Sequence, residues 1–110
     1  MVKSENARLD AVFHALADPT RRAILQGLER GERTVSEVAR PHAMSLVAVS
    51  KHLKVLEQAG LVARRKQGSF QLVHGNPAAL HTAERWLAEY RRFWNKRLDA
   101  LQSLLEGTEQ

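Results

Sequence analysis

The hydrophobic period of this chain changes at Gly60. Before this glycine, apolar residues recur about every 3.6 positions, which is the spacing of one face of a helix. In residues 46–59, the residues Leu46, Val49, Leu53 and Leu56 form one such apolar stripe. After it, two runs with a period of about two, residues 61–66 and 69–73, flank Gly68 and predict a β-hairpin. A long helical pattern then starts at Pro77. The pattern therefore predicts several helices, one hairpin and a final helix.

Capping and breaking residues divide the segment before Gly60 into helices. Asp18 before Pro19 is a helix start, residues 34–37 (TVSE) form a capping box, and Ser45 is an N-cap residue. Gly27 falls inside the second helix, which suggests that another helix approaches closely there. The expected helices cover about residues 5–16, 19–30, 35–40 and 46–59, and the last begins behind Asn76 as N-cap.

The length of 110 residues suits one domain with a single modest core. The fold class that follows is mainly α with a small β-hairpin, in the order α-α-α-α-β-β-α. Within residues 1–110 we expect the first two helices at 5–30, a helix-turn-helix at 34–59, a wing at 61–74 and a dimerisation helix at 77–106.

Charge indicates the class of partner. The chain carries 17 Lys and Arg against 12 Asp and Glu, a net +5. Residues 51–68 hold five of the basic residues and one acidic residue, so much of the excess lies at the end of one helix and in the hairpin. Such a concentration is typical of a surface that meets a polyanion.

Several function classes are excluded or disfavoured. The chain has no cysteine, so disulfides and thiolate metal sites cannot form. No apolar run approaches the roughly 18 residues of a membrane span, and the N-terminus lacks a signal-peptide pattern. We expect a cytoplasmic protein. No catalytic motif, phosphate loop or metal triad is present, so we do not expect an enzyme, and we expect no cofactor.

The order of elements is typical of a helix-turn-helix: a short helix, a turn and a longer helix with small residues near its start. The hairpin that follows is typical of a wing. The longer helix is narrow enough to enter the major groove, where small and polar side chains reach base edges, while the wing meets the DNA backbone. The residues that we expect to contact double-stranded DNA are Ser45, Val47, Ala48, Ser50, Lys51, His52, Lys54, Arg64, Arg65, Lys66, Gln67 and Ser69.

Two stretches resemble the signatures of one family. Residues 17–25 (ADPTRRAIL) and 50–62 (SKHLKVLEQAGLV) are similar to the two signature segments of the ArsR-type winged-helix transcriptional regulators. The resemblance extends from about Leu9 to the end of the last helix. It implies a homodimeric repressor that covers a palindromic operator and leaves it when an inducing signal, such as a small molecule, binds.

The sequence departs from the metal-sensing branch of that family. The stretch that matches the cysteine-bearing helix, residues 34–40, contains no cysteine. His81 with Glu84 on the last helix, and His74 or His14, are the remaining candidates, and they do not supply the four ligands that zinc requires. We therefore expect no metal site, with a metal- or small-molecule-sensing repressor using a non-cysteine site as the alternative.

The last helix carries a heptad-like seam about 43 Å long. Its first turns, with Trp86 and Leu87, are expected to close the monomer core. The remainder is too long to be hidden in one chain, so we expect a homodimer, with an apolar ligand pocket as another use of the aromatic residues. The expected interface comprises Leu9, Val12, Phe13, Leu87, Tyr90, Phe93, Trp94, Leu98, Leu101 and Leu105.

One further alternative is a winged-helix module that binds proteins and has lost its DNA role. Salt separates the two hypotheses, because phosphate contacts weaken steeply with salt concentration and an apolar protein interface does not.

Overall fold

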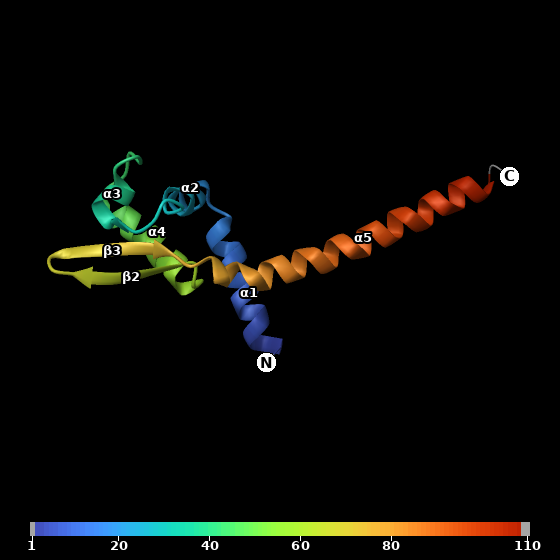
Figure 1. The fold of residues 1–110 in the computed structure, drawn as a ribbon, viewed down its shortest axis with the longest axis horizontal. Coiled ribbons are helices and arrows are strands. Elements are labelled where there is room, and N and C mark those ends of the chain that lie inside the picture. The colour runs from blue at the N-terminus through green and yellow to red at the C-terminus, as the bar shows by residue number, and fades with distance from the viewer. Residues whose placement is uncertain (1, 109–110) are drawn as a thin grey trace.

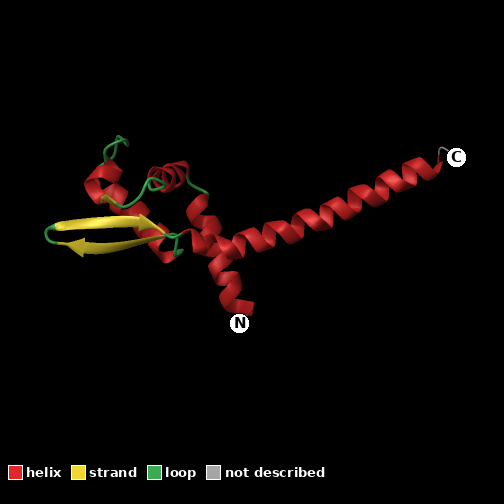
Figure 2. Cartoon of the chain, in the orientation of Figure 1, coloured by secondary structure: helices red, strands yellow, loops and turns green. Residues whose placement is uncertain are grey.

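The computed structural model describes residues 2–108, with side chains over residues 6–107. Helices dominate it and the strands form one small sheet, as Figure 2 shows. The elements in chain order are α1 (Val2–Leu16), α2 (Pro19–Gly27), β1 (Arg33–Thr34), α3 (Val35–Ala39), α4 (Leu46–Gln58), β2 (Val62–Gln67), β3 (Phe70–Gly75), the 3-10 helix η1 (Pro77–Leu80) and α5 (His81–Thr108).

The described chain consists of a small body and one projecting helix. Figure 1 shows α5 leaving the body beside α1 and extending far beyond it, while the hairpin β2–β3 points the opposite way. The overall extents are 73 × 34 × 21 Å. The distal part of α5 therefore lies outside the core of its own chain.

The predicted helix starts at Asp18, Thr34 and Ser45 are confirmed. The carboxylate of Asp18 accepts a hydrogen bond from the backbone N–H of Arg21 at 3.0 Å. Thr34 and Glu37 form the reciprocal capping box, at 3.1 and 3.0 Å. The Ser45 hydroxyl accepts from the N–H of Ala48 at 3.2 Å. These caps fix the α2, α3 and α4 starts and hence the turn between α3 and α4.

The sheet contains one strand more than the sequence analysis predicts. Its order is β1-β3-β2, antiparallel throughout, with β3 in the centre. The additional strand β1 has only two residues, Arg33 and Thr34, which pair with Val73 and Leu72. Two residues cannot show an alternating pattern, so the sequence gives no signal for this strand.

The core forms where α4 packs on α2, α3 and the base of the sheet. Val49, Leu53 and Leu56 of the predicted α4 stripe are fully buried. Leu46, the fourth member of that stripe, is 55% exposed, so this part of the prediction is wrong. Leu46 is the first residue of α4, directly after its cap, and lies beyond the edge of the core.

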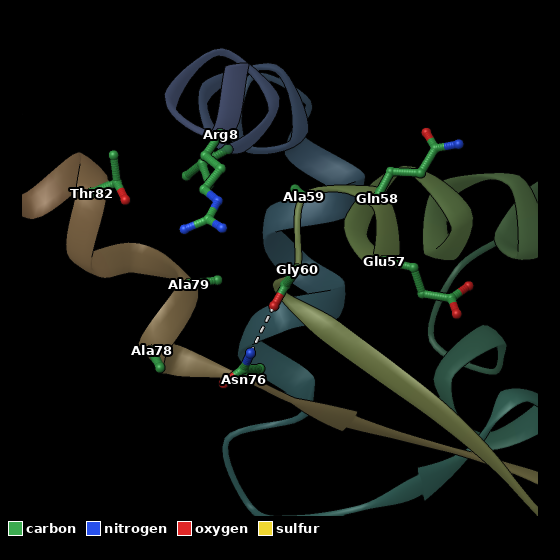
Figure 3. A pocket seen from close by; sticks show the side chains of 10 residues that line it. Arg8, Glu57, Gln58, Ala59, Gly60, Asn76, Ala78, Ala79 and Thr82 are labelled. Carbon is green, nitrogen blue, oxygen red and sulfur yellow. Dashed lines mark hydrogen bonds between the residues drawn. The ribbon is translucent and has the colours of Figure 1, made fainter. Parts of the chain in front are cut away.

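Three other local predictions are wrong. Helix α2 ends at Gly27 rather than at Arg30, and a Cβ at Gly27 would meet no atom within 4 Å, so no helix approaches closely there. The Asn76 side chain does not cap the helix that follows it. It instead donates to the carbonyl oxygen of Gly60 at 3.0 Å, as Figure 3 shows, and joins the start of η1 to the end of α4.

We expect Gly60→Ala to lower the free energy of unfolding by about 1 kcal/mol or more, measured by urea denaturation. Gly60 has a φ of 76°, which an L side chain rarely adopts, and Ala79 Cβ lies 3.6 Å from the position of the added methyl group. Gly27→Ala is the matched control, because it is helical and faces open space; it should be stabilising by about 0.5 kcal/mol. Equal stability of Gly60→Ala and the parent protein would contradict the strain argument.

None of the described helices is both long enough and apolar enough to cross a membrane.

Candidate nucleic-acid interface

Helix α4 has one buried and one exposed face. Val49, Leu53 and Leu56 lie in the core. Val47, Lys51 and Lys54 are exposed on the other side, with Ala48 half-buried between them. Leu46 adds an exposed apolar side chain at the start of the helix. The spacing of Leu46 predicts a place in the apolar stripe, so the sequence does not reveal it as a surface residue.

The hairpin supplies the second part of the surface. Arg65, Lys66, Gln67 and Ser69 are exposed in or next to its turn, where Gly68 has a φ of 61°. Phe70 at the start of β3 is also largely exposed and pairs with Gln67 across the hairpin. The sequence does not reveal this exposure of Phe70, because alternation within β3 does not distinguish a solvent-facing tip from the base.

Arg64 fastens the hairpin to α4. Its Nε donates to the Glu57 carboxylate at 2.7 Å, and its Nη1 lies 3.4 Å from the hydroxyl of Ser50. Both partners belong to α4, and the Arg64 side chain is only 21% exposed. Arg64 and Ser50 therefore set the angle between helix and hairpin, and their contact with DNA stays a prediction.

His52 is held at the opposite margin of α4 by the α1–α2 corner. The guanidinium of Arg21 donates to the carbonyl oxygens of His14 and Ala15, both at 2.8 Å, and lies 3.4 Å from Nδ1 of His52. Asp18 Oδ2 is 3.9 Å from the same nitrogen. The backbone N–H of Arg21 lowers the pKa of Asp18. This network joins α4 to the end of α1, and DNA contact by His52 also stays a prediction.

Arg65 has a carboxylate partner from a distant segment. Its Nε and Nη2 donate to the two oxygens of Glu32, at 2.9 and 2.7 Å, and His74 Nδ1 lies 3.5 Å from Glu32 Oε2. The hydrogen bond from Arg65 lowers the pKa of Glu32, and the same pair raises the pKa of Arg65. Nothing in the sequence pairs these residues, because they lie 33 positions apart.

Three lysines complete the positive surface. Among the described residues, no carboxylate lies within 4 Å of the ammonium groups of Lys51, Lys54 and Lys66. Two of the five predicted basic contacts, Arg64 and Arg65, thus have acidic partners within the chain, and the three lysines have exposed and unpaired charges.

The apolar seam of α5 is exposed in the monomer. Aromatic rings form a continuous ladder from Phe13 through Trp86 and Tyr90 to Trp94, with centroids 5.1 to 6.0 Å apart. The Phe93 ring contacts Trp94 edge-on, and the guanidinium of Arg97 lies 4.9 Å from its centroid. Seven apolar residues of the seam have relative exposures between 47% and 59%: Leu87, Tyr90, Phe93, Trp94, Leu98, Leu101 and Leu105.

Two predictions about this region need correction. Trp86 and Leu87 do not close the monomer core, because both are about half exposed; Ala83, one turn earlier, is buried instead. Val12 is 1% exposed, so it lies inside the monomer rather than on the surface offered to a partner. Leu9, half-buried, and Phe13, exposed, remain at the surface of α1.

The structure does not bring the metal-ligand candidates together. Within residues 6–107, no three His, Cys, Asp or Glu side chains are grouped so that they could hold a metal ion. His74 contacts Glu32, which is engaged by Arg65. His81 and Glu84 lie on the first turn of α5 without a third partner in the described part.

Comparison with known proteins places this architecture in a class. A family model described as a helix-turn-helix domain matches residues 16–65. The HTH-type transcriptional regulator Rv2034 of Mycobacterium tuberculosis is 38% identical over 98 residues, 89% of each chain. The transcriptional repressor SdpR of Bacillus subtilis is 32% identical over 82 residues, 74% of this chain and 91% of SdpR.

Solved structures agree with the sequence comparisons. The crystal structure of an ArsR family transcriptional regulator is 41% identical with a TM-score of 0.77, covering 82% of this chain and 93% of that one. A homodimeric winged helix-turn-helix DNA-binding domain from Mycobacterium bovis, solved by NMR, is 30% identical with a TM-score of 0.60, covering 84% of each. The fold and surface are those of a winged helix-turn-helix transcriptional regulator. The chain belongs to the ArsR family.

Proposed function

We propose that this protein is a homodimeric transcriptional repressor that binds a palindromic operator in double-stranded DNA. Helix α4 enters the major groove, and the β2–β3 hairpin acts as the wing against the backbone. Exposed Val47 and half-buried Ala48 are suited to contact thymine methyl groups. Lys51, Lys54 and Lys66 are suited to reach phosphates or base edges. Gln67 and Ser69 complete the contacts at the wing.

One observation carries the proposal. Val49, Leu53 and Leu56 of the α4 stripe are fully buried, while the side of the helix that faces solvent presents unpaired lysines next to a basic hairpin. A helix that served only the core would have no need of this surface. The hydrogen bonds of Arg64 to Glu57 and Ser50 keep the helix and hairpin at one angle, so the binding surface is formed before DNA arrives.

The exposed seam of α5 supports a homodimer. Contiguous apolar surface of this length on one helix is typical of a protein–protein interface, and the related domain from Mycobacterium bovis is described as homodimeric. In a twofold dimer the two α4 helices can reach successive major grooves, about 34 to 36 Å apart. Leu9 and Phe13 of α1 belong to the same interface.

Repression is the direction that the relatives favour, since SdpR is described as a repressor. A repressor of this kind leaves its operator in response to a signal, for which we propose a small molecule rather than a metal ion. This function places the protein in the cytoplasm with the chromosome. No catalytic role is proposed.

Salt dependence tests the proposal. We expect the logarithm of the DNA association constant to fall linearly with the logarithm of salt concentration, measured by fluorescence anisotropy on duplexes selected from the host genome. Lys66→Ala should reduce the slope by about two, because each of two protomers loses one phosphate contact worth about 0.9. Lys96→Ala on α5 makes the same charge change outside the proposed surface and should leave the slope unchanged.

Two results would contradict the proposal. One is binding to a protein ligand but to no duplex even at low salt, which would favour the protein-interaction module. The other is a reduction of the slope by Lys96→Ala equal to that caused by Lys66→Ala, since the charge would then act without regard to position.

A further inference from the structure

A cavity of about 520 Å³ lies where the end of α2, the loop before β1, the end of β3 and η1 meet. Its volume is in the range of cavities that bind small organic molecules. Leu28 and Leu61 form buried parts of its wall, and Leu25 and Leu80 are half-buried. Pro77 adds an apolar ring. The interior can therefore remove an apolar group of substantial size from water.

Two of the five polar side chains that line the cavity are carboxylates. Glu29 and Glu32 both line it, and none of its described lining residues is Lys or Arg. The Glu32 carboxylate holds the Arg65 guanidinium through two hydrogen bonds and has His74 at 3.5 Å. The hydrogen bond from Arg65 lowers the pKa of Glu32, which favours the ionised carboxylate. The rim is thus a site where a carboxylate already binds a cation.

We infer that this cavity binds a small amphiphilic cation, an apolar body carrying an amine, whose ammonium group takes the place of Arg65 on Glu32. The apolar body lies against the leucines, and Glu29 adds a second negative charge. An organic anion would meet both carboxylates and is disfavoured. A metal ion is disfavoured as well, because no group of three ligands exists in the described part of the chain.

The exchange has a consequence for DNA, which rests on the proposed function. Arg65 lies on the hairpin that acts as the wing, and Glu32 competes with phosphate for its guanidinium. A ligand ammonium on Glu32 releases Arg65 to the DNA backbone, so this ligand tightens DNA binding and is not the inducing signal that removes the repressor from its operator. By linkage, DNA strengthens ligand binding by the same factor.

The first test measures ligand binding without DNA. The probe is naphthylethylamine, followed by its own fluorescence, with naphthylethanol and naphthylpropionic acid as neutral and anionic counterparts. We expect saturable binding of the amine and at least about tenfold weaker binding of both counterparts, since a charge-assisted hydrogen bond is lost. Equal affinity for the three compounds, or no binding of the amine at millimolar concentration, would overturn the inference.

Variants locate the site. Glu32→Gln should weaken the amine about tenfold, and Asp99→Asn on distal α5, which makes the same charge change, should not. Arg65→Ala should bind the amine more tightly than the parent protein, because Glu32 is no longer shared. If Glu32 had only a structural role, Glu32→Gln and Arg65→Ala would not change the amine affinity in opposite directions. Unchanged amine affinity in both variants would overturn the site.

The second test adds duplex DNA. The amine should raise the DNA affinity of the parent protein and leave Arg65→Ala unaffected, while Glu32→Gln should bind DNA tightly without ligand. An amine that binds but does not change DNA affinity would overturn the coupling. Failure of every form to bind DNA would instead refute the proposed function, and the amine measurements would stand independently of it.

Discussion

The double substitution Trp94→Glu with Leu98→Glu is expected to convert the protein to monomers and to weaken operator binding by at least about a hundredfold. Both side chains lie about half exposed in the middle of the α5 seam. In the proposed dimer they are buried against the partner, and an unpaired carboxylate buried there costs several kcal/mol. Sedimentation velocity measures the association state, and anisotropy measures the DNA affinity.

The control variant adds the same charge on a different face of α5. Asn95→Glu with Ser103→Glu adds the same two carboxylates to exposed positions of α5 that lie away from the seam. This variant should remain dimeric. Its DNA affinity should lie within about threefold of that of the parent protein, because only the general repulsion between the added charge and DNA acts on it. A dimer that survives in the seam variant would refute the assignment of this face.

The second large effect concerns the recognition surface. Lys51→Ala with Lys54→Ala should weaken operator binding about a thousandfold at physiological salt while leaving the melting temperature nearly unchanged. Each lost base or phosphate contact costs about 1 kcal/mol or more, and a dimer loses four of them. Neither lysine has a carboxylate within 4 Å among the described residues, so the fold does not depend on their charges.

Arg92→Ala with Lys96→Ala is the matched comparison, because it removes two positive charges from α5. This pair should change operator affinity by less than about tenfold, through net charge alone. If the two double variants lost affinity equally, α4 would have no special position at the DNA and the major-groove assignment would be wrong.

Local features of the fold could be predicted from the sequence because short-range chemistry determines them. Each cap at Asp18, Thr34 and Ser45 joins residues only three positions apart. The capping residue, a Ser, Thr or Asp, and its partner can therefore both be recognised within a short stretch of the sequence. The same holds for the hairpin, where Gly68 supplies the positive φ of the turn.

The predictions that failed depend on what lies beyond the local segment. Leu46 has the period of a core residue, but as the first residue of α4 it lies beyond the elements that would cover it. Asn76 has the residue type of a cap, yet its amide donates to Gly60, which is 16 positions away. Val12 is apolar on an amphipathic helix, and the sequence does not tell which apolar side chains face the monomer core and which face solvent.

For the candidate site, the sequence indicated the elements and most of the exposed residues, but not their partners. Arg64 and Arg65 are adjacent and chemically identical, yet one is fastened to α4 and the other to Glu32 in the loop before β1. Only the register of β2 on β3 and the position of that loop decide this difference. Long-range ion pairs of this kind have no signature in composition or period.

The stoichiometry of the complex on DNA tests most directly whether two copies of this chain, joined by α5, present paired α4 helices to one duplex. Sedimentation velocity on the shortest genomic duplex that is bound should show two protomers per duplex and no complex of one protomer, even when DNA is in excess. The protein alone should sediment as a dimer at micromolar concentration. A complex of one protomer per duplex with undiminished affinity, or a monomer in the free protein, would contradict this arrangement.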